Sequence, residues 1–162
     1  MKIKENTIIF ETSRAISNIE ITIGVDTYET AYEKLKDLLV GFIAPHKTLT
    51  TKHVGVLITA DNFYGIDYAD ILLYFNNNDI LQSVVVQPHW SFMAEFNIEP
   101  DLYSIVKNKC DKSLNENFKL DSDSSTVKIY LSDKLVISTV ESILTDNSKN
   151  FCVNITKDSK ED

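Results

Sequence analysis

Short stretches of the chain alternate between apolar and polar residues, a pattern typical of half-buried β-strands. Two of these stretches read as antiparallel hairpins, near 67–87 with Asn76–Asn78 as the turn and near 127–140 with Ser132 and Asp133 as the turn. The segment DNFYGI at 61–66 is predicted to connect two strands. The predicted strands lie at 7–13, 18–24, 53–60, 67–75, 79–88, 127–131, 134–140 and 150–156.

Apolar residues at helical spacing predict two helices. In the first, at about 27–43, Asp26 or Thr27 can cap the N-terminus, and a stripe of tyrosine, leucine and phenylalanine faces the sheet. The second, at about 99–111, has Pro100 in its first turn, the helical position where proline fits best.

Together these patterns predict an α+β fold, with a mainly antiparallel sheet of about 6–8 strands packed with two or three helices. The polar, serine-rich segment 111–125 is predicted to be a loop with room for one short strand. A length of 162 residues and a hydrophobic content of 43% suit one domain with its own core. We assign residues 1–156 to this domain and 157–162 to a charged C-terminal tail.

Charge is distributed unevenly along the chain. Residues 1–52 carry seven acids and seven bases, and residues 107–162 carry ten acids and nine bases. Between Lys52 and Lys107 lie seven acids and no lysine or arginine, so this base-free window holds nearly all of the net charge of -8. Such a field attracts a basic partner and repels phosphates. We therefore expect no direct nucleic acid ligand.

The stretch DNFYGIDYAD at 61–70 concentrates acids and aromatic rings in a predicted connector, where folding needs neither. Tyrosine and tryptophan in loops supply large contact areas at low entropic cost, which favours a binding surface. Core packing of the rings and a purely solubilising role of the acids remain alternative interpretations. The candidate partner-binding residues are Asp61, Phe63, Tyr64, Asp67, Tyr68, Asp70, Asp79 and Trp90.

Signatures of catalysis or of cofactor or metal binding do not stand out. The four glycines form neither a phosphate-binding loop nor a dinucleotide fingerprint, and no G-x-S-x-G elbow is present. His46, His53 and His89 fit surface or turn positions better than a catalytic or metal site. Cys110 and Cys152 fit reduced, partly buried thiols. We therefore expect no catalytic residue, no cofactor and no metal.

No apolar run reaches the roughly 18 residues of a membrane span. The N-terminal MKIKENTIIFETSR lacks the long apolar region and the small-residue cleavage site of a signal peptide. We therefore expect a cytoplasmic protein without membrane contact, either a monomer or a weak homodimer.

This acidic, cysteine-poor α+β profile, rich in asparagine and lysine and without catalytic motifs, resembles bacterial immunity proteins of toxin–immunity systems, including contact-dependent growth inhibition. The resemblance covers the overall profile and carries over no residue roles. It implies a partner that is a basic toxin C-terminal domain, often a nuclease, whose active site is blocked. The candidate aspartates then pair with toxin lysines or arginines, and Tyr64, Tyr68 and Trp90 act as apolar anchors.

Other modes and classes of function stay open. A partner hairpin could instead extend an exposed strand edge. A small enzyme or ligand-binding domain would have a pocket between the first helix and the sheet, with His53 or His89 as the base. A subunit of a permanent assembly would bury the aromatic cluster in a stable homo-oligomer.

Overall fold

The computed structural model of the chain describes residues 2–10, 18–48, 51–143 and 148–159, without the side chains of 38–61, Trp90 and Met93. The elements in chain order are β1 (Lys2–Lys4), β2 (Thr7–Phe10), β3 (Ile19–Thr22), α1 (Tyr28–Leu35), the 3-10 turn η1 (Lys36–Leu38), β4 (Leu39–Thr48), β5 (Thr51–Phe63), β6 (Ile66–Phe75), β7 (Leu81–Pro88), α2 (Trp90–Ile98), α3 (Pro100–Asn117), β8 (Lys119–Asp123), β9 (Val127–Leu131), β10 (Leu135–Ile143) and β11 (Lys149–Lys157).

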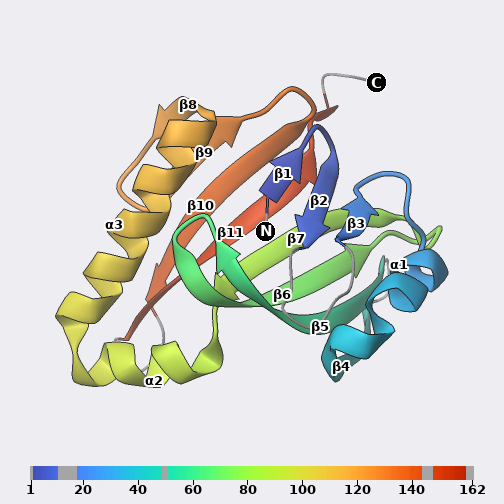
Figure 1. Cartoon of the computed structure of the whole chain (residues 1–162), viewed down its shortest axis with the longest axis horizontal. Coiled ribbons are helices and arrows are strands. Elements are labelled where there is room, and N and C mark those ends of the chain that lie inside the picture. The colour runs from blue at the N-terminus through green and yellow to red at the C-terminus, as the bar shows by residue number, and fades with distance from the viewer. Residues whose placement is uncertain (1, 11–17, 49–50, 144–147, 160–162) are drawn as a thin grey trace.

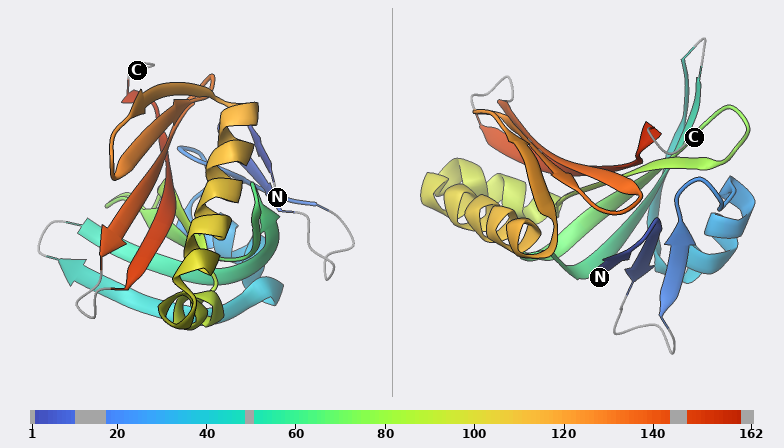
Figure 2. Two further views of the ribbon diagram at one scale, coloured as in Figure 1. Left: turned by 90° about the vertical axis from the view of Figure 1, so that its left-hand side faces the viewer. Right: turned by 90° about the horizontal axis from the view of Figure 1, so that it is seen from above.

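The strands form two antiparallel sheets (Figure 1). The larger has eight strands in the order β4-β5-β6-β7-β11-β10-β9-β8, and the smaller has three in the order β1-β2-β3. Figure 2 shows the larger sheet strongly curved, with α2 and α3 beside one end and the small sheet with α1 beside the other. The predicted α+β fold, mainly antiparallel with few helices, is confirmed.

A single hydrophobic core joins one face of the large sheet to the other elements. Alternate residues of β6, β7, β10 and β11 point into it, as the two-residue period of a strand requires. The small sheet contributes Ile8 and Ile21, α1 contributes Leu35, and α3 contributes Cys110 and Leu114. The core therefore unites the N-terminal, middle and C-terminal parts of the described chain.

Both predicted hairpins are confirmed, since β6 pairs with β7 and β9 pairs with β10 in antiparallel register. In the first turn, the side-chain oxygen of Asn76 accepts hydrogen bonds from the backbone N–H groups of Asn78 (2.9 Å) and Ile80 (3.1 Å). Asparagine thus fixes the turn by mimicking a backbone acceptor.

The first helix begins as predicted but ends early. Thr27 is its cap, because the side chain accepts a hydrogen bond from the backbone N–H of Thr30 (3.2 Å). A 3-10 turn then leads into β4, so the prediction of helix at 39–43 is wrong. That segment, LVGFI, is rich in β-branched and aromatic residues, and pairing with β5, for example Phe42 opposite Val56, satisfies its backbone as a strand.

The second predicted helix is longer than expected, and another helix precedes it. α3 starts at Pro100 as predicted but continues to Asn117, because Leu114 follows Cys110 by four residues and extends the buried stripe. The loop prediction for 111–125 is therefore wrong over its first part, and the rest contains β8. α2 escaped prediction because its apolar residues have no helical periodicity.

The C-terminal end of the sheet extends slightly further than predicted. β11 includes Lys157, and the backbone N–H of Asp158 donates to the carbonyl of Lys134 (2.9 Å). Lys157, the first residue of the predicted tail at 157–162, therefore belongs to the sheet. No helix formed by the described residues is long and apolar enough to cross a membrane.

Candidate functional site

The acidic and aromatic stretch 61–70 is the closed end of a β-hairpin, and of the connector predicted at 61–66 Tyr64 and Gly65 alone lie outside the strands. β5 runs through Phe63, which pairs with Ile66 of β6, so Tyr64 and Gly65 form a two-residue turn. Both have a positive φ, 36° and 86°, as the turn that joins twisted antiparallel strands requires. Because the flanking residues are in strands, their side chains point alternately to opposite faces of the sheet.

Two of the candidate partner-binding residues serve the interior. Phe63 is completely buried in the core, so the structure places it out of reach of a surface partner. The Tyr64 ring packs edge-on against Phe63 (centroids 4.9 Å apart) and Phe118 (5.3 Å), and its hydroxyl accepts a hydrogen bond from the backbone N–H of Ile3 (2.9 Å). Burial raises the pKa of Tyr64, so the hydroxyl stays protonated. Tyr64 thus ties β1 and the end of α3 to the hairpin.

Asp67, Tyr68 and Asp70 do not share one exposed face. Asp67 is exposed and forms an ion pair with Lys109 of α3 (2.8 Å). Tyr68 points to the other face of β6, where its ring lies 4.5 Å from that of His89. Asp70 is on the same face as Tyr68 but is buried, with one carboxylate oxygen 3.8 Å from Nε2 of His89. The predicted acidic surface is therefore divided between the two sides of the sheet.

The remaining candidates add little to a common surface. Asp79 lies in the turn at the other end of the β6–β7 hairpin, with a φ of 60°. The side chains of Asp61 and Trp90 lie outside the described part of the structure, although the backbone of Asp61 pairs with Tyr68 and Trp90 begins α2. Of the eight candidates, the structure brings Tyr68 and Asp70 together around His89.

His89 lies between Asp70 and Ser91 in an arrangement that no sequence spacing reveals. The Ser91 hydroxyl is 2.7 Å from Nδ1 of His89, and this nitrogen also accepts a hydrogen bond from the Ser91 backbone N–H (3.3 Å). In the neutral ring the proton is then on Nε2, which faces Asp70 across 3.8 Å, too far for a hydrogen bond. Pairing of Ala69 with Pro88 creates this contact between distant parts of the sequence.

The other histidines and the cysteines weighed in the sequence are not gathered into a metal site or a reactive thiol among the described residues. Within the described residues, no group of three or more His, Cys, Asp or Glu side chains is placed to hold a metal ion. The backbones of His46 and His53 pair across β4 and β5, but their side chains are not described. Burial and the neighbouring charge of Asp111 raise the pKa of Cys110 to about 12, and burial raises the pKa of Cys152. Neither free thiol is therefore an activated nucleophile.

Three other acids of the base-free window meet where α2 ends and α3 begins. Glu95, Glu99 and Asp101 are exposed, and their side chains have no hydrogen-bond or ion-pair partner among the described residues. Ile98 and Ile105 beside them are 80% and 62% exposed. We call these five residues the α2–α3 corner, which lies at the lower left of Figure 1. In the sequence these acids stand out by their charge alone, and no motif places them in a site.

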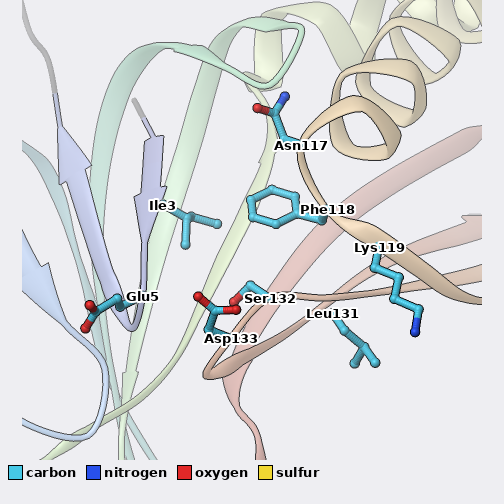
Figure 3. Close-up of a pocket in the computed structure, with 8 residues that line it drawn as sticks. All are labelled: Ile3, Glu5, Asn117, Phe118, Lys119, Leu131, Ser132 and Asp133. Carbon is cyan, nitrogen blue, oxygen red and sulfur yellow. The ribbon is translucent and has the colours of Figure 1, made fainter.

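A pocket of about 390 Å³ opens where β1, the end of α3 and the β9–β10 turn meet, and we call it the β1–α3 pocket. Its volume falls in the range of small-molecule sites, roughly 300–1,000 Å³. It draws together three segments that are far apart in the sequence, which is why no motif predicts it. The residues that line it, shown in Figure 3, are Ile3, Glu5, Asn117, Phe118, Lys119, Leu131, Ser132 and Asp133.

The two carboxylates of the β1–α3 pocket differ in whether they have a charged partner. The Glu5 carboxylate is 3.6 Å from the Lys134 amine, just outside the lining. Asp133 has no hydrogen-bond or ion-pair partner for its side chain among the described residues. In Figure 3 the Asp133 carboxylate, Ile3 and the Phe118 ring face a common space, whereas the amine of Lys119 points away from it. The pocket thus combines an apolar wall with one unpaired carboxylate.

No protein-family model, curated protein or solved structure matches this chain. The groups that the fold places together are therefore the basis for inferring function. They are the α2–α3 corner, the β1–α3 pocket and the Asp70–His89–Ser91 group. Only the third includes a residue from the list of candidate partner-binding residues.

Proposed function

We propose that this protein binds and neutralises a basic protein partner, in the manner of the bacterial immunity proteins that its sequence profile resembles. The observation that carries the proposal is the α2–α3 corner, where exposed isoleucines and acids without a side-chain partner among the described residues follow one another along the chain. Binding, not catalysis, is the activity that this surface supports.

The acids of the corner differ from other aspartates of the chain, which form ion pairs with lysines. Asp26 is paired with Lys34, and Asp67 with Lys109, each at 2.8 Å. Asp111 likewise has a lysine partner within the described structure. The corner acids have no such side-chain partner. The N-terminus of α3 attracts Asp101 in its first turn, and an external cation would relieve the repulsion that remains.

Within each of the two helices, the spacing of the corner residues places them on one side. Glu95, Ile98 and Glu99 follow each other at three and four residues along α2 and its C-terminal cap, and therefore lie on one side of the helix. Asp101 and Ile105 are related by four residues in the same way on α3. An apolar centre with a charged rim is the usual anatomy of a protein–protein interface.

The exposed isoleucines favour a protein over a small ion as the partner. Isolated exposed apolar residues are common, but neighbouring large ones at this level of exposure mark an interaction surface. The acids select a basic partner and accelerate its association. A basic toxin domain, such as a nuclease that holds nucleic acid with lysine and arginine, has the required charge.

The proposal is tested by capture from lysate of the source cell, with the purified protein as bait. Glu95→Lys together with Glu99→Lys should abolish retention of a basic protein that the wild type retains. The matched control is Glu29→Lys with Glu33→Lys on α1, which has the same spacing and the same change in charge. Equal retention by the two double variants would contradict the proposal.

The kinetics of the captured partner give a second measurement. Because long-range attraction acts mainly on encounter, the corner variant should lower the association rate more than it raises the dissociation rate. Raising the salt concentration should reduce the wild-type association rate towards that of the variant. An association rate that does not depend on salt would contradict the role of the corner charges.

One observation favours a second candidate function, a small hydrolase. The Ser91 hydroxyl lies 2.7 Å from Nδ1 of His89, whose other nitrogen faces the buried Asp70 carboxylate. A serine, a histidine and a carboxylate in this order can activate the hydroxyl as a nucleophile. Covalent labelling of Ser91 by a fluorophosphonate, and its loss in His89→Ala, would support this function. An unlabelled Ser91 would contradict this function and leave His89 with a structural role as the N-cap of α2.

A further inference from the structure

We propose that the β1–α3 pocket binds an organic cation, a guanidinium or ammonium group on a short methylene chain. The charge would sit at Asp133, and the chain would lie against Ile3 and Phe118. The pocket is beside the C-terminal end of α3, whereas the α2–α3 corner is at the N-terminal end, about 27 Å away for an 18-residue helix. It is therefore a second site, independent of the proposed docking surface.

Asp133 supplies the charge that selects a cation. It is exposed in the turn between β9 and β10, without a side-chain partner among the described residues. The nearby amines do not neutralise the Asp133 carboxylate, because the Lys134 amine lies 3.6 Å from Glu5 and the Lys119 amine points away in Figure 3. A carboxylate in this situation gains most from a positively charged hydrogen-bond donor.

Ile3 and Phe118 supply the wall that selects a chain of methylene groups. Both are partly buried and pack against the hydrophobic core, so each offers one apolar side to the pocket. Methylene groups placed there leave water, and the face of an aromatic ring attracts a cation. An anion would instead meet the carboxylates of Asp133 and Glu5.

Local contacts hold these walls in place before any ligand binds. Tyr64 accepts a hydrogen bond from the N–H of Ile3 and packs against Phe118, which sets the distance between them. The turn that carries Asp133 is closed by hydrogen bonds from Ser132 N–H to the Leu135 carbonyl (3.0 Å) and from Leu135 N–H to the Ser132 hydroxyl (3.2 Å). A preformed site loses little conformational freedom on binding.

The test is a titration of isotope-labelled protein with N-acetyl-arginine amide, followed through its amide chemical shifts. We expect saturable shifts at residues 3–5, 117–119 and 131–133. The citrulline analogue, which has the same shape without the charge, should cause none. Asp133→Asn should weaken binding of the arginine compound about fivefold, because a charge-assisted hydrogen bond is lost at an exposed site. The matched change Asp101→Asn at the corner should leave the affinity unaltered.

Three outcomes would overturn the inference: equal binding of the citrulline compound, unchanged affinity in Asp133→Asn, or shifts that appear equally at the corner acids. The source of the cation is resolved by comparing agmatine with a blocked glycine-rich peptide that contains one arginine. Tighter binding of the peptide assigns the pocket to a protein side chain, and tighter binding of agmatine assigns it to a free amine. Asp133→Asn protein should still capture the basic partner, because the proposed docking surface is the α2–α3 corner. This measurement therefore separates failure of the pocket proposal from failure of the docking proposal.

Discussion

The hairpin end at 61–70 and the α2–α3 corner both come from the part of the chain that lacks lysine and arginine, yet their acids are in opposite situations. In the hairpin, Asp67 is paired with Lys109, which is 42 residues away in the sequence, and Asp70 is buried near His89. At the corner, Glu95 and Glu99 have no side-chain partner among the described residues. A base-free window in sequence is therefore not a base-free region in space.

The apolar side chains of the two regions also differ, because those of the hairpin are turned inward and those of the corner are exposed. Phe63 and Tyr64 look like loop anchors in the sequence, but the two-residue turn directs both rings inward. At the corner, the exposed apolar residues are Ile98 and Ile105. No pattern in the sequence marks these two isoleucines as surface residues. Surface availability is thus decided by strand register and helix orientation, not by residue type.

The largest effect that separates the two regions is on stability. Phe63→Ala should lower the free energy of unfolding by about 3–5 kcal/mol, because it removes a fully buried ring and leaves a cavity. Ile98→Ala should change it by less than about 0.5 kcal/mol, since the side chain is mostly exposed. Urea denaturation of both variants measures this difference. Similar losses of stability in the two variants would contradict the burial of Phe63 in the core and the exposure of Ile98 at the surface.

Gly65 gives the next largest effect and tests how the hairpin is held against α3. A Cβ at this position would lie 2.7 Å from the Lys109 carbonyl oxygen, and the φ of 86° also disfavours a side chain. Gly65→Ala should therefore cost about 2–3 kcal/mol.

Gly24→Ala is the matched control for this change. Gly24 has a similar φ of 82°, but among the described residues its Cβ would meet only the side chain of Lys157, at 3.6 Å. The cost should then be about 1 kcal/mol, from backbone strain alone. Equal losses in thermal unfolding of the two variants would show that the close approach of α3 to the hairpin contributes nothing.

Much of the fold follows from local pattern. The hairpins at 67–87 and 127–140 were predictable because asparagine or serine–aspartate turns separate alternating apolar strands. The start of α1 was predictable from its capping residues. Its end was not, because LVGFI satisfies a helical stripe as well as a strand, and only the partner β5 decides between them.

The candidate site was less predictable than the fold, for a physical reason. Ion pairs such as Asp67 with Lys109, and walls such as Ile3 with Phe118, join residues that only tertiary packing brings together. The sequence signals acidity and aromatic content, but it does not signal which acids are neutralised. The repulsion between the acids at 95 and 99 was not a usable clue, because it depends on α2, a helix that the pattern of apolar residues does not predict.

An acid that the fold neutralises should stabilise the protein in a pH-dependent way, and Asp26 shows this most clearly. Burial by itself raises the pKa of Asp26, but hydrogen bonds from Lys34 and from the Thr22 backbone hold the pKa below its ordinary value. The stabilisation is complete above the unfolded pKa, near 4, and is lost as the pH falls through the lower folded pKa.

Asp26→Asn should therefore cost about 1–2 kcal/mol at pH 7, and the difference from the wild type should shrink below about pH 4. Unfolding curves between pH 2 and pH 7 measure it. Asp37→Asn, at an exposed site, is the control. A penalty for Asp26→Asn that stays constant down to pH 2 would show that the charge of Asp26 does not contribute to stability.

The smallest effects come from removing one acid from each region. We expect the two changes to alter stability in opposite directions. Glu95→Gln relieves repulsion from Glu99 and removes a negative charge from the C-terminal half of α2, so it should raise stability by about 0.2–0.5 kcal/mol. Asp67→Asn breaks the exposed pair with Lys109 and should lower stability by about 0.2–1 kcal/mol. Differential scanning calorimetry at low salt resolves the sign, and high salt should shrink both effects. If both variants were destabilised, the corner acids would be stabilising the fold. Their exposure would then not indicate a binding partner.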